Sequence, residues 1–219
     1  MAWCDRSSPR TRPAGSGAAP ILASAGLLLV GCAPFAELQG ARLAGRGRTE
    51  ITGSFSSVSY SEGGQTETLQ REYTGQLAVG TGERTDWRFR YTYIGPPDGG
   101  GGGLHVFGAG PKYSVVRDRF AAAIPVGFGY GQDIDVGDTF QVHPTILFTF
   151  PAAAGLDVNL SGKMLIRFTG GETGFAANLG LAIGPDLPRW ALRPEVGVLA
   201  YTSTSGYFRH ASIGLSWGW

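Results

Sequence analysis

The C-terminal stretch Ser205-Gly-Tyr-Phe-Arg-His-Ala-Ser-Ile-Gly-Leu-Ser-Trp-Gly-Trp219 decides the fold. Large apolar residues alternate in it with small or polar ones, although Phe208 departs from the pattern. A period of two is typical of a strand whose two faces meet different surroundings. The apolar set is Tyr207, Ala211, Ile213, Leu215, Trp217 and Trp219, and the other set is His210, Ser212, Gly214, Ser216 and Gly218. We therefore expect a two-faced strand that closes a sheet.

Similar alternation recurs from Glu50 onward, in runs separated by clusters of Gly, Pro and Asp, which indicates a barrel or a sandwich. The expected strands are 51–60, 73–79, 87–93, 107–115, 120–130, 140–150, 156–168, 175–183, 190–198 and 205–219. Their number is even and their lengths are close to the about 9–11 residues with which a tilted strand crosses a bilayer. The sequence thus predicts an all-β fold, an antiparallel up-and-down transmembrane β-barrel of ten strands over residues 49–219. The first run shifts phase before Val58, as at a bulge, and the fourth is also irregular, so eight strands stay possible.

The connections alternate between two classes. The tight ones are 80–84, 117–118, 151–155 and 184–189, and the longer, more polar ones are 61–67, 95–103, 131–139 and 170–172. Membrane barrels have short periplasmic turns and longer outer loops. This pattern predicts that both termini lie in the periplasm.

Composition excludes two other classes of protein. No window holds the roughly 18 consecutive apolar residues that a membrane-spanning helix needs. The formal net charge is +1 and no basic stripe is present, which argues against a nucleic-acid-binding protein.

The polar face of the expected strands carries charges of both signs. The residues that we expect to line the lumen are Arg88, Arg90, Lys112, Asp157, Lys163, Arg167, Arg193, Glu195 and His210. These charges fit a small wet lumen, since an apolar ligand cavity lined by them would be costly. The apolar face ends in Trp and Tyr residues, as interfacial girdles do. The reverse arrangement, a lipocalin-like periplasmic lipoprotein that binds a ligand inside, remains an alternative.

Residues 1–31 have the basic start and apolar centre of an export signal. The signal ends in Leu29-Val30-Gly31-Cys32, which resembles a bacterial lipobox. The resemblance implies a lipoprotein signal peptide, with Cys32 lipidated as the first residue of the mature chain. We expect residues 32–48 to form a lipidated tether, in preference to a plug that enters the lumen.

The end of the chain adds a second resemblance. Ser212-x-Gly214-x-x-Trp217-x-Trp219 resembles the C-terminal assembly signal of outer-membrane proteins, and the segment from about Glu50 onward resembles small bacterial barrels of the OmpA/OmpW-like kind. This resemblance implies a place in the outer membrane of a Gram-negative cell envelope. It also implies contact with outer-membrane lipids and recognition by the barrel-assembly machinery during biogenesis.

Motifs that suggest chemistry are weak. Gly214-Leu-Ser216-Trp-Gly218 matches a hydrolase pattern, but no acid or His follows it in the chain. His210-x-Ser212 resembles the pair of lipid A deacylase barrels, but it shares the lumen side and lacks the following Glu. We expect no catalytic residue, no cofactor and no metal site, and a structural or narrow-pore role. A hydrolase that modifies envelope lipids is the alternative.

Overall fold

The computed structural model describes residues 34–98, 102–131, 134–171 and 173–219. The elements are β1 (Thr49–Glu62), β2 (Gln65–Gly80), β3 (Thr85–Gly95), β4 (Leu104–Val116), β5 (Phe120–Ala123), β6 (Val126–Gly131), the 3-10 helix η1 (Val136–Thr139), β7 (Gln141–Val142), β8 (Thr145–Ala153), β9 (Leu156–Arg167), β10 (Thr173–Ile183), β11 (Trp190–Tyr201) and β12 (Tyr207–Gly218). In this part of the chain, no helix is long and apolar enough to be a membrane span.

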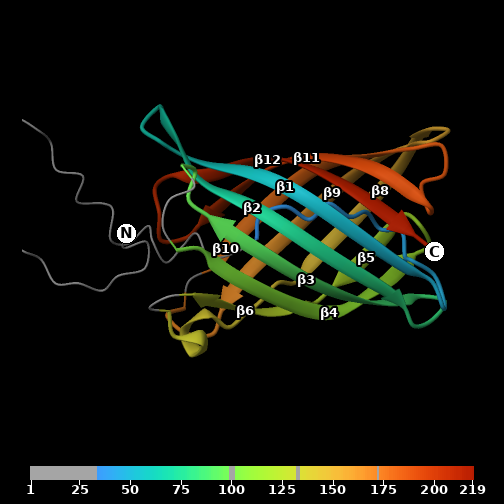
Figure 1. Ribbon diagram of the computed structural model, residues 1–219, viewed down its shortest axis with the longest axis horizontal. Helices are drawn as coiled ribbons and strands as arrows, with labels where there is room; N and C mark the ends of the chain where they lie inside the picture. The colour runs from blue at the N-terminus through green and yellow to red at the C-terminus, as the bar shows by residue number, and fades with distance from the viewer. Residues whose placement is uncertain (1–33, 99–101, 132–133, 172) are drawn as a thin grey trace, which may run out of the picture.

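The strands form one closed antiparallel barrel (Figure 1). The first and last strands, β1 and β12, pair over their full length, from Glu50 opposite Gly218 to Ser61 opposite Tyr207. This pairing joins the two ends of the chain's strand order and leaves the sheet without a free edge. The expected closing strand is thus confirmed, and closure satisfies the backbone groups that an open sheet would expose to lipid.

Two barrel strands are interrupted by proline, which lacks the amide hydrogen that a ladder needs. Pro125 separates β5 from β6, and Pro144 separates β7 from β8. The breaks are bridged, because His143 N donates to Pro125 O at 2.8 Å and Met164 N donates to Pro144 O at 3.0 Å. Counting each interrupted pair as one strand, the barrel has ten strands, as predicted.

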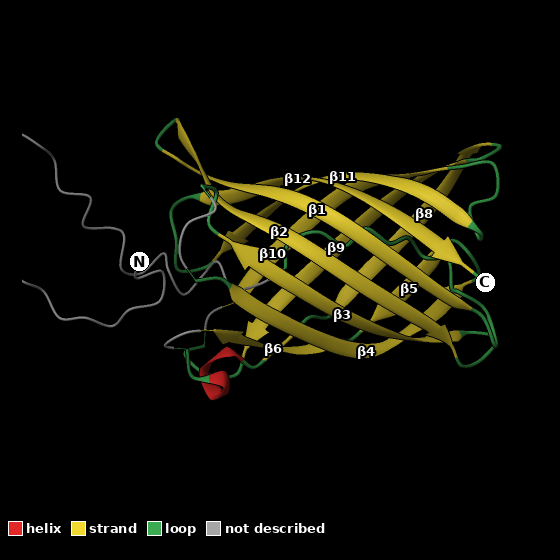
Figure 2. Ribbon diagram, viewed as in Figure 1, coloured by secondary structure: helices red, strands yellow, loops and turns green. Residues whose placement is uncertain are grey.

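The two ends of the barrel differ (Figure 2). The connections β2–β3, β4–β5, β8–β9 and β10–β11 lie together at one end, which we call the turn end. The β3–β4, β6–β7, β9–β10 and β11–β12 connections lie at the other end, which we call the loop end.

The prediction of a long loop over residues 61–67 is wrong. The strands β1 and β2 meet in a two-residue turn at Gly63 and Gly64, with φ values of 58° and 82°. Two glycines at positive φ suit the tight turn that the twist of a hairpin favours. The bulge expected in the first strand before Val58 is wrong: β1 pairs with β12 without a register shift, and Val58 is simply an apolar residue that faces the lumen. The shift between β1 and β2 lies after Val58 and comes from an extra residue on β2, Leu69.

Large apolar side chains point outward. In β12 buried and exposed residues alternate without a break, and Ile213, Leu215 and Trp217 are on the exposed side. The same holds around the barrel, where neighbouring aromatic rings pack on the outside, as Phe120 and Phe148 do at 4.8 Å. An apolar outer band with a polar interior is the arrangement of a membrane barrel. A lipocalin-like binding protein would have the reverse arrangement, so the geometry argues against that alternative.

We expect an arginine in the middle of this outer band to destabilise the barrel much more than one at its edge. Leu179 lies at the middle of β10 and Ile183 at its turn end, both outward-facing and exposed. Leu179→Arg should lower the free energy of unfolding in lipid vesicles by about 2–4 kcal/mol, and Ile183→Arg by about 1 kcal/mol or less, because the cost depends on depth in the bilayer. Urea titration followed by tryptophan fluorescence measures both. Equal losses would argue against a membrane-spanning band.

Candidate functional site: a lumen filled by the N-terminal segment

Residues 34–44, which we call the plug, run through the inside of the barrel. In Figure 1 the blue segment before β1 passes between the two ends within the ring of strands. The side chains of residues 34–41 are buried, and at the turn end Gly47 N donates to Gly80 O at 2.9 Å before β1 begins. The expected tether outside the barrel is therefore wrong for this segment, and the plug interpretation is correct. Polar groups on the inner face of the wall need partners, and the plug supplies them.

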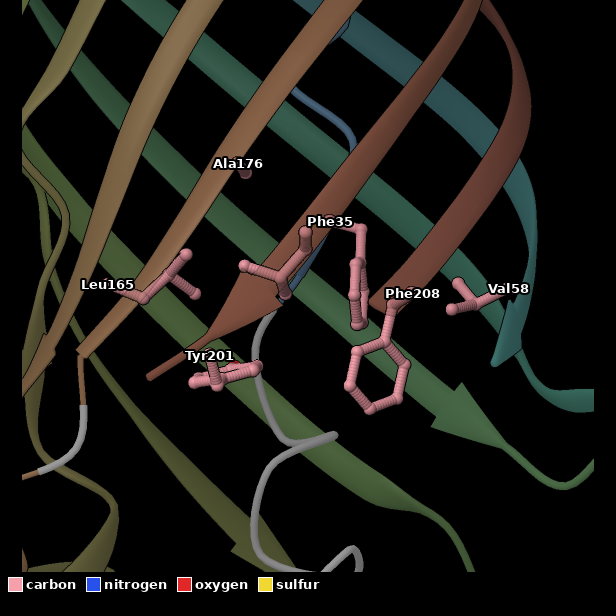
Figure 3. Close-up of a cluster of buried hydrophobic side chains, with 7 residues drawn as sticks. Phe35, Val58, Leu165, Ala176, Tyr201 and Phe208 are labelled. Atoms are coloured by element: carbon pink, nitrogen blue, oxygen red, sulfur yellow. The ribbon is translucent and has the colours of Figure 1, made fainter. Parts of the chain in front are cut away.

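An apolar contact holds the plug at the loop end (Figure 3). Phe35 is 1% exposed and packs against Phe208, with ring centroids 5.5 Å apart. Val58, Leu165 and Leu199 belong to the same cluster, from three other parts of the wall. All of these wall residues face a lumen that is otherwise mostly polar. Phe208 in the opening stretch was such a departure, and inward apolar residues of this kind are the sequence signal that could have predicted the plug.

Glu37 is the charged centre of the plug. It is 3% exposed, and its carboxylate lies 3.0 Å from Lys163 Nζ and 3.4 Å from Arg90 Nη2. Gln39 Nε2 donates to the same carboxylate at 2.7 Å. Buried charges are tolerated when they are paired and hydrogen-bonded. Two cations of the wall are thus paired with one carboxylate of the plug rather than with acidic groups of the wall.

Side chains of the wall also take up the backbone of the plug. Glu195 accepts from the amides of Glu37 and Leu38, each at 2.7 Å. Lys112 Nζ donates to the carbonyl groups of Gly40 at 2.6 Å and Arg42 at 2.7 Å. None of the described strands pairs with the plug, so these bonds satisfy groups that would otherwise be buried and unpaired. Further bonds of this kind join Phe35 N to Glu72, Ala41 N to Thr149 and Lys163 to Pro34 O.

Ion pairs continue to the turn end. Arg42 binds Asp157 with two hydrogen bonds, of 2.6 and 3.2 Å. Arg88 and Arg193 share Glu50, each at 3.3 Å. A cavity of about 420 Å³ lies among these residues.

The charged groups inside the barrel balance. Six are acidic and six are basic: Glu37, Glu50, Glu72, Asp86, Asp157 and Glu195 against Arg42, Arg88, Arg90, Lys112, Lys163 and Arg193. With His neutral the difference is 6 − 6 = 0. The plug contributes one acid and one base to this set, Glu37 and Arg42, and both pair with groups of the wall.

Of the expected lumen residues, Lys112, Asp157, Lys163, Arg193, Glu195 and His210 are buried inside, and Arg88 and Arg90 are partly buried there. Arg167 is half-buried at the loop end of β9. In the expected assembly signal, Ser212 and Gly214 face inward while Trp217 and Trp219 face outward. Cys32 and the signal peptide lie outside the described residues, and the assembly signal stays a prediction.

His210 and Ser212 form a hydrogen-bonded pair inside the lumen. His210 Nδ1 lies 2.8 Å from Ser212 Oγ, and its Nε2 lies 3.1 Å from Asn178 Oδ1. Ser212 in turn donates to Ser56 Oγ, and the ring of Phe35 lies 6.5 Å from that of His210. The pair resembles a nucleophile and base, but the plug covers it and lipid is on the other face of the strand. Among the described residues, no group of three or more His, Cys, Asp or Glu side chains is arranged to hold a metal ion.

No family model matches the chain, and no curated protein matches it. Several solved barrels are similar in shape. The attachment invasion locus protein Ail of Yersinia pestis has 11% identity and a TM-score of 0.37, covering 80% of this chain and 99% of that one. Neisserial surface protein A has 9% identity and a TM-score of 0.37, covering 78% and 99%. The translocator domain of the autotransporter NalP from Neisseria meningitidis has 12% identity and a TM-score of 0.43, covering 79% and 88%.

These likenesses are distant, and the class of protein follows from the chain's own geometry. A closed barrel of ten antiparallel strands, an apolar outer band and a polar interior define a small membrane-spanning β-barrel. Its distinguishing feature is that the lumen is filled by the segment that precedes the first strand.

Proposed function

We propose that this protein is an integral outer-membrane β-barrel lipoprotein with a structural, non-enzymatic role, whose N-terminal segment keeps its lumen closed. The observation that carries the proposal is the pairing of Glu37 with Lys163 and Arg90 inside the barrel. A plug held by the Glu37 ion pairs and by hydrogen bonds from its backbone to the wall would occupy the path that a solute needs. A narrow pore is the second candidate.

The proposal includes an orientation. Short turns face the periplasm in membrane barrels, so the turn end and Trp219, whose carbonyl accepts from Thr49 N at the start of β1, would lie on that side. Phe35 packs at the loop end, and Pro34 would therefore lie toward the cell exterior. Under this orientation the two ends of the described chain, Pro34 and Trp219, lie on opposite sides of the membrane, in contrast to the prediction that both termini are periplasmic.

The path also changes what lipidation would mean. Only Ala33 lies between Cys32 and Pro34 in the sequence, and two residue steps reach at most about 7 Å. A lipid on Cys32 would then enter the outer leaflet at the cell surface, and the barrel would carry its anchor from one side of the membrane to the other. Lipidation itself is supported by the lipobox at Leu29–Cys32.

An enzyme on envelope lipids is less well supported. Its candidate pair, His210 and Ser212, is 5% and 9% exposed and lies on the lumen face. A lipid substrate would need access through the wall or past the plug.

We expect single-cysteine labelling on intact cells to report the orientation. Gln65→Cys, at the loop end, should react with a membrane-impermeant maleimide on intact cells. Under the proposed orientation Ala33→Cys, next to Pro34 in the sequence, should react as well. Asp186→Cys, in the β10–β11 turn, should react only after the outer membrane is permeabilised. The parent protein gives the background. Labelling of Ala33→Cys together with Asp186→Cys, and not with Gln65→Cys, would overturn the proposed path.

A further inference from the structure

Two arginines interrupt the uncharged outer surface of the barrel. Arg71 on β2 and Arg209 on β12 are exposed at positions that alternate outward. Apart from the tip of the β1–β2 hairpin, the other outward positions of the described strands carry apolar or neutral side chains. A charge in this face is costly at the bilayer centre and nearly free at its surface. Both arginines therefore belong at the level of the lipid head groups.

The two arginines lie on either side of one strand at nearly the same height. Arg71 is opposite Ser57 of β1, and Arg209 is opposite Ser59 of the same strand. Neighbouring strands are roughly 4.8 Å apart, so the two side chains, which flank β1, reach a common point above it. The hydroxyl groups of Ser59 and Thr68 lie there too, 3.3 Å from each other and exposed.

Their height is fixed by the aromatic belt. Tyr73 follows Arg71 by two residues on β2, in the direction of the turn end. Its ring packs on that of Phe55 of β1, with centroids 5.3 Å apart. Such rings mark the boundary between the apolar core of the membrane and the head groups. Arg71 lies just beyond that boundary, toward the loop end.

The donors of both arginines are available. Arg209 donates to Thr66 Oγ1 at 2.5 Å, which uses one of its amino groups, and Arg71 has no hydrogen bond or ion pair with the described residues. The nearby carboxylate of Glu62 is bound to Tyr60 and Ser205 instead. Guanidinium groups bind phosphate through two parallel hydrogen bonds.

We propose that Arg71 and Arg209, with the hydroxyl groups between them, bind a phosphate group of an outer-leaflet glycolipid of the lipid A type. This site rests on the proposed orientation, in which the loop end faces the cell exterior. The lipid would sit against β1 and the β1–β12 seam, where its head group bridges three strands.

The test measures binding of bis-phosphorylated lipid A to the purified full chain in detergent by native mass spectrometry. The Arg71→Gln/Arg209→Gln variant should raise the dissociation constant roughly ten- to thirtyfold, since each basic residue at an anionic membrane surface contributes about a factor of five. The matched control, Arg84→Gln/Arg189→Gln, removes two exposed arginines at the turn end and should change it less than about twofold. Dephosphorylated lipid A should bind the unaltered protein as weakly as lipid A binds the first variant.

Equal losses in the two double variants would overturn the site, because general charge would then explain binding. Displacement of lipid A by millimolar inorganic phosphate would also overturn it, since the site would then recognise the free ion. The cysteine labelling described above reports the orientation without any lipid ligand. A reversed labelling pattern therefore contradicts the proposed orientation, whereas loss of phosphate selectivity contradicts this site alone.

Discussion

A barrel that lacks the plug is expected to conduct ions in a planar bilayer, whereas the chain that retains it stays closed. The comparison is between residues 33–219 and residues 45–219, both refolded into detergent. Removal of the plug frees the space now filled by Phe35, Glu37 and Leu38, and leaves charged side chains facing water. We expect discrete, long-lived current steps from the shorter chain and none from the longer one.

A point variant tests the same idea with the chain intact. A Cβ at Gly40 would overlap the side chains of Thr149 and Asn159, so Gly40→Trp should expel the plug and open the barrel. Gly53→Trp is the matched control, because Gly53 has open space around it. If the unaltered chain of residues 33–219 gave currents as large as those of residues 45–219, the result would contradict the closed state. A silent chain of residues 45–219 that is folded by circular dichroism would show that something other than the plug blocks the passage.

Glu37→Ala should cost the folded barrel about 3–5 kcal/mol, the loss expected when one partner of a buried ion pair is removed. Lys163 and Arg90 would keep their charge inside the wall without the carboxylate that now lies 3.0 and 3.4 Å away. Lys163 retains the carbonyl oxygen of Pro34 at 2.8 Å, so the lower end of the range is expected. The loss is measured by urea titration in vesicles, or by the temperature above which the folded barrel unfolds and changes its mobility on a detergent gel.

The matched control for this variant is Glu67→Ala, which removes an exposed carboxylate near the hairpin tip and should change stability by about 0.5 kcal/mol or less. The double variant Glu37→Gln/Lys163→Met removes both charges and should recover part of the loss. If Glu37→Ala and Glu67→Ala behave alike, the plug does not contribute to the stability of the barrel.

Much of the fold could be predicted because the alternation is local. Ser205–Trp219 has its two faces written in consecutive residues, and the same period identified all ten strands. Pro125 and Pro144 split two of them without ending the ladder, since the carbonyl groups of both prolines still accept hydrogen bonds from adjacent segments of the barrel. The β1–β2 connection was less predictable, because two glycines at positive φ made a tight turn where polar residues indicated a loop.

The plug was decided by tertiary structure alone. Glu37 meets Glu195 at a separation of 158 residues, and no periodic pattern in residues 34–44 indicates such a partner. The burial of the plug depends on Lys163, Glu195 and other groups that come together only when the barrel closes. The sequence by itself therefore determined the wall, whose strands repeat a local period. What fills the wall depended on a balance of buried charges that exists only around a closed lumen.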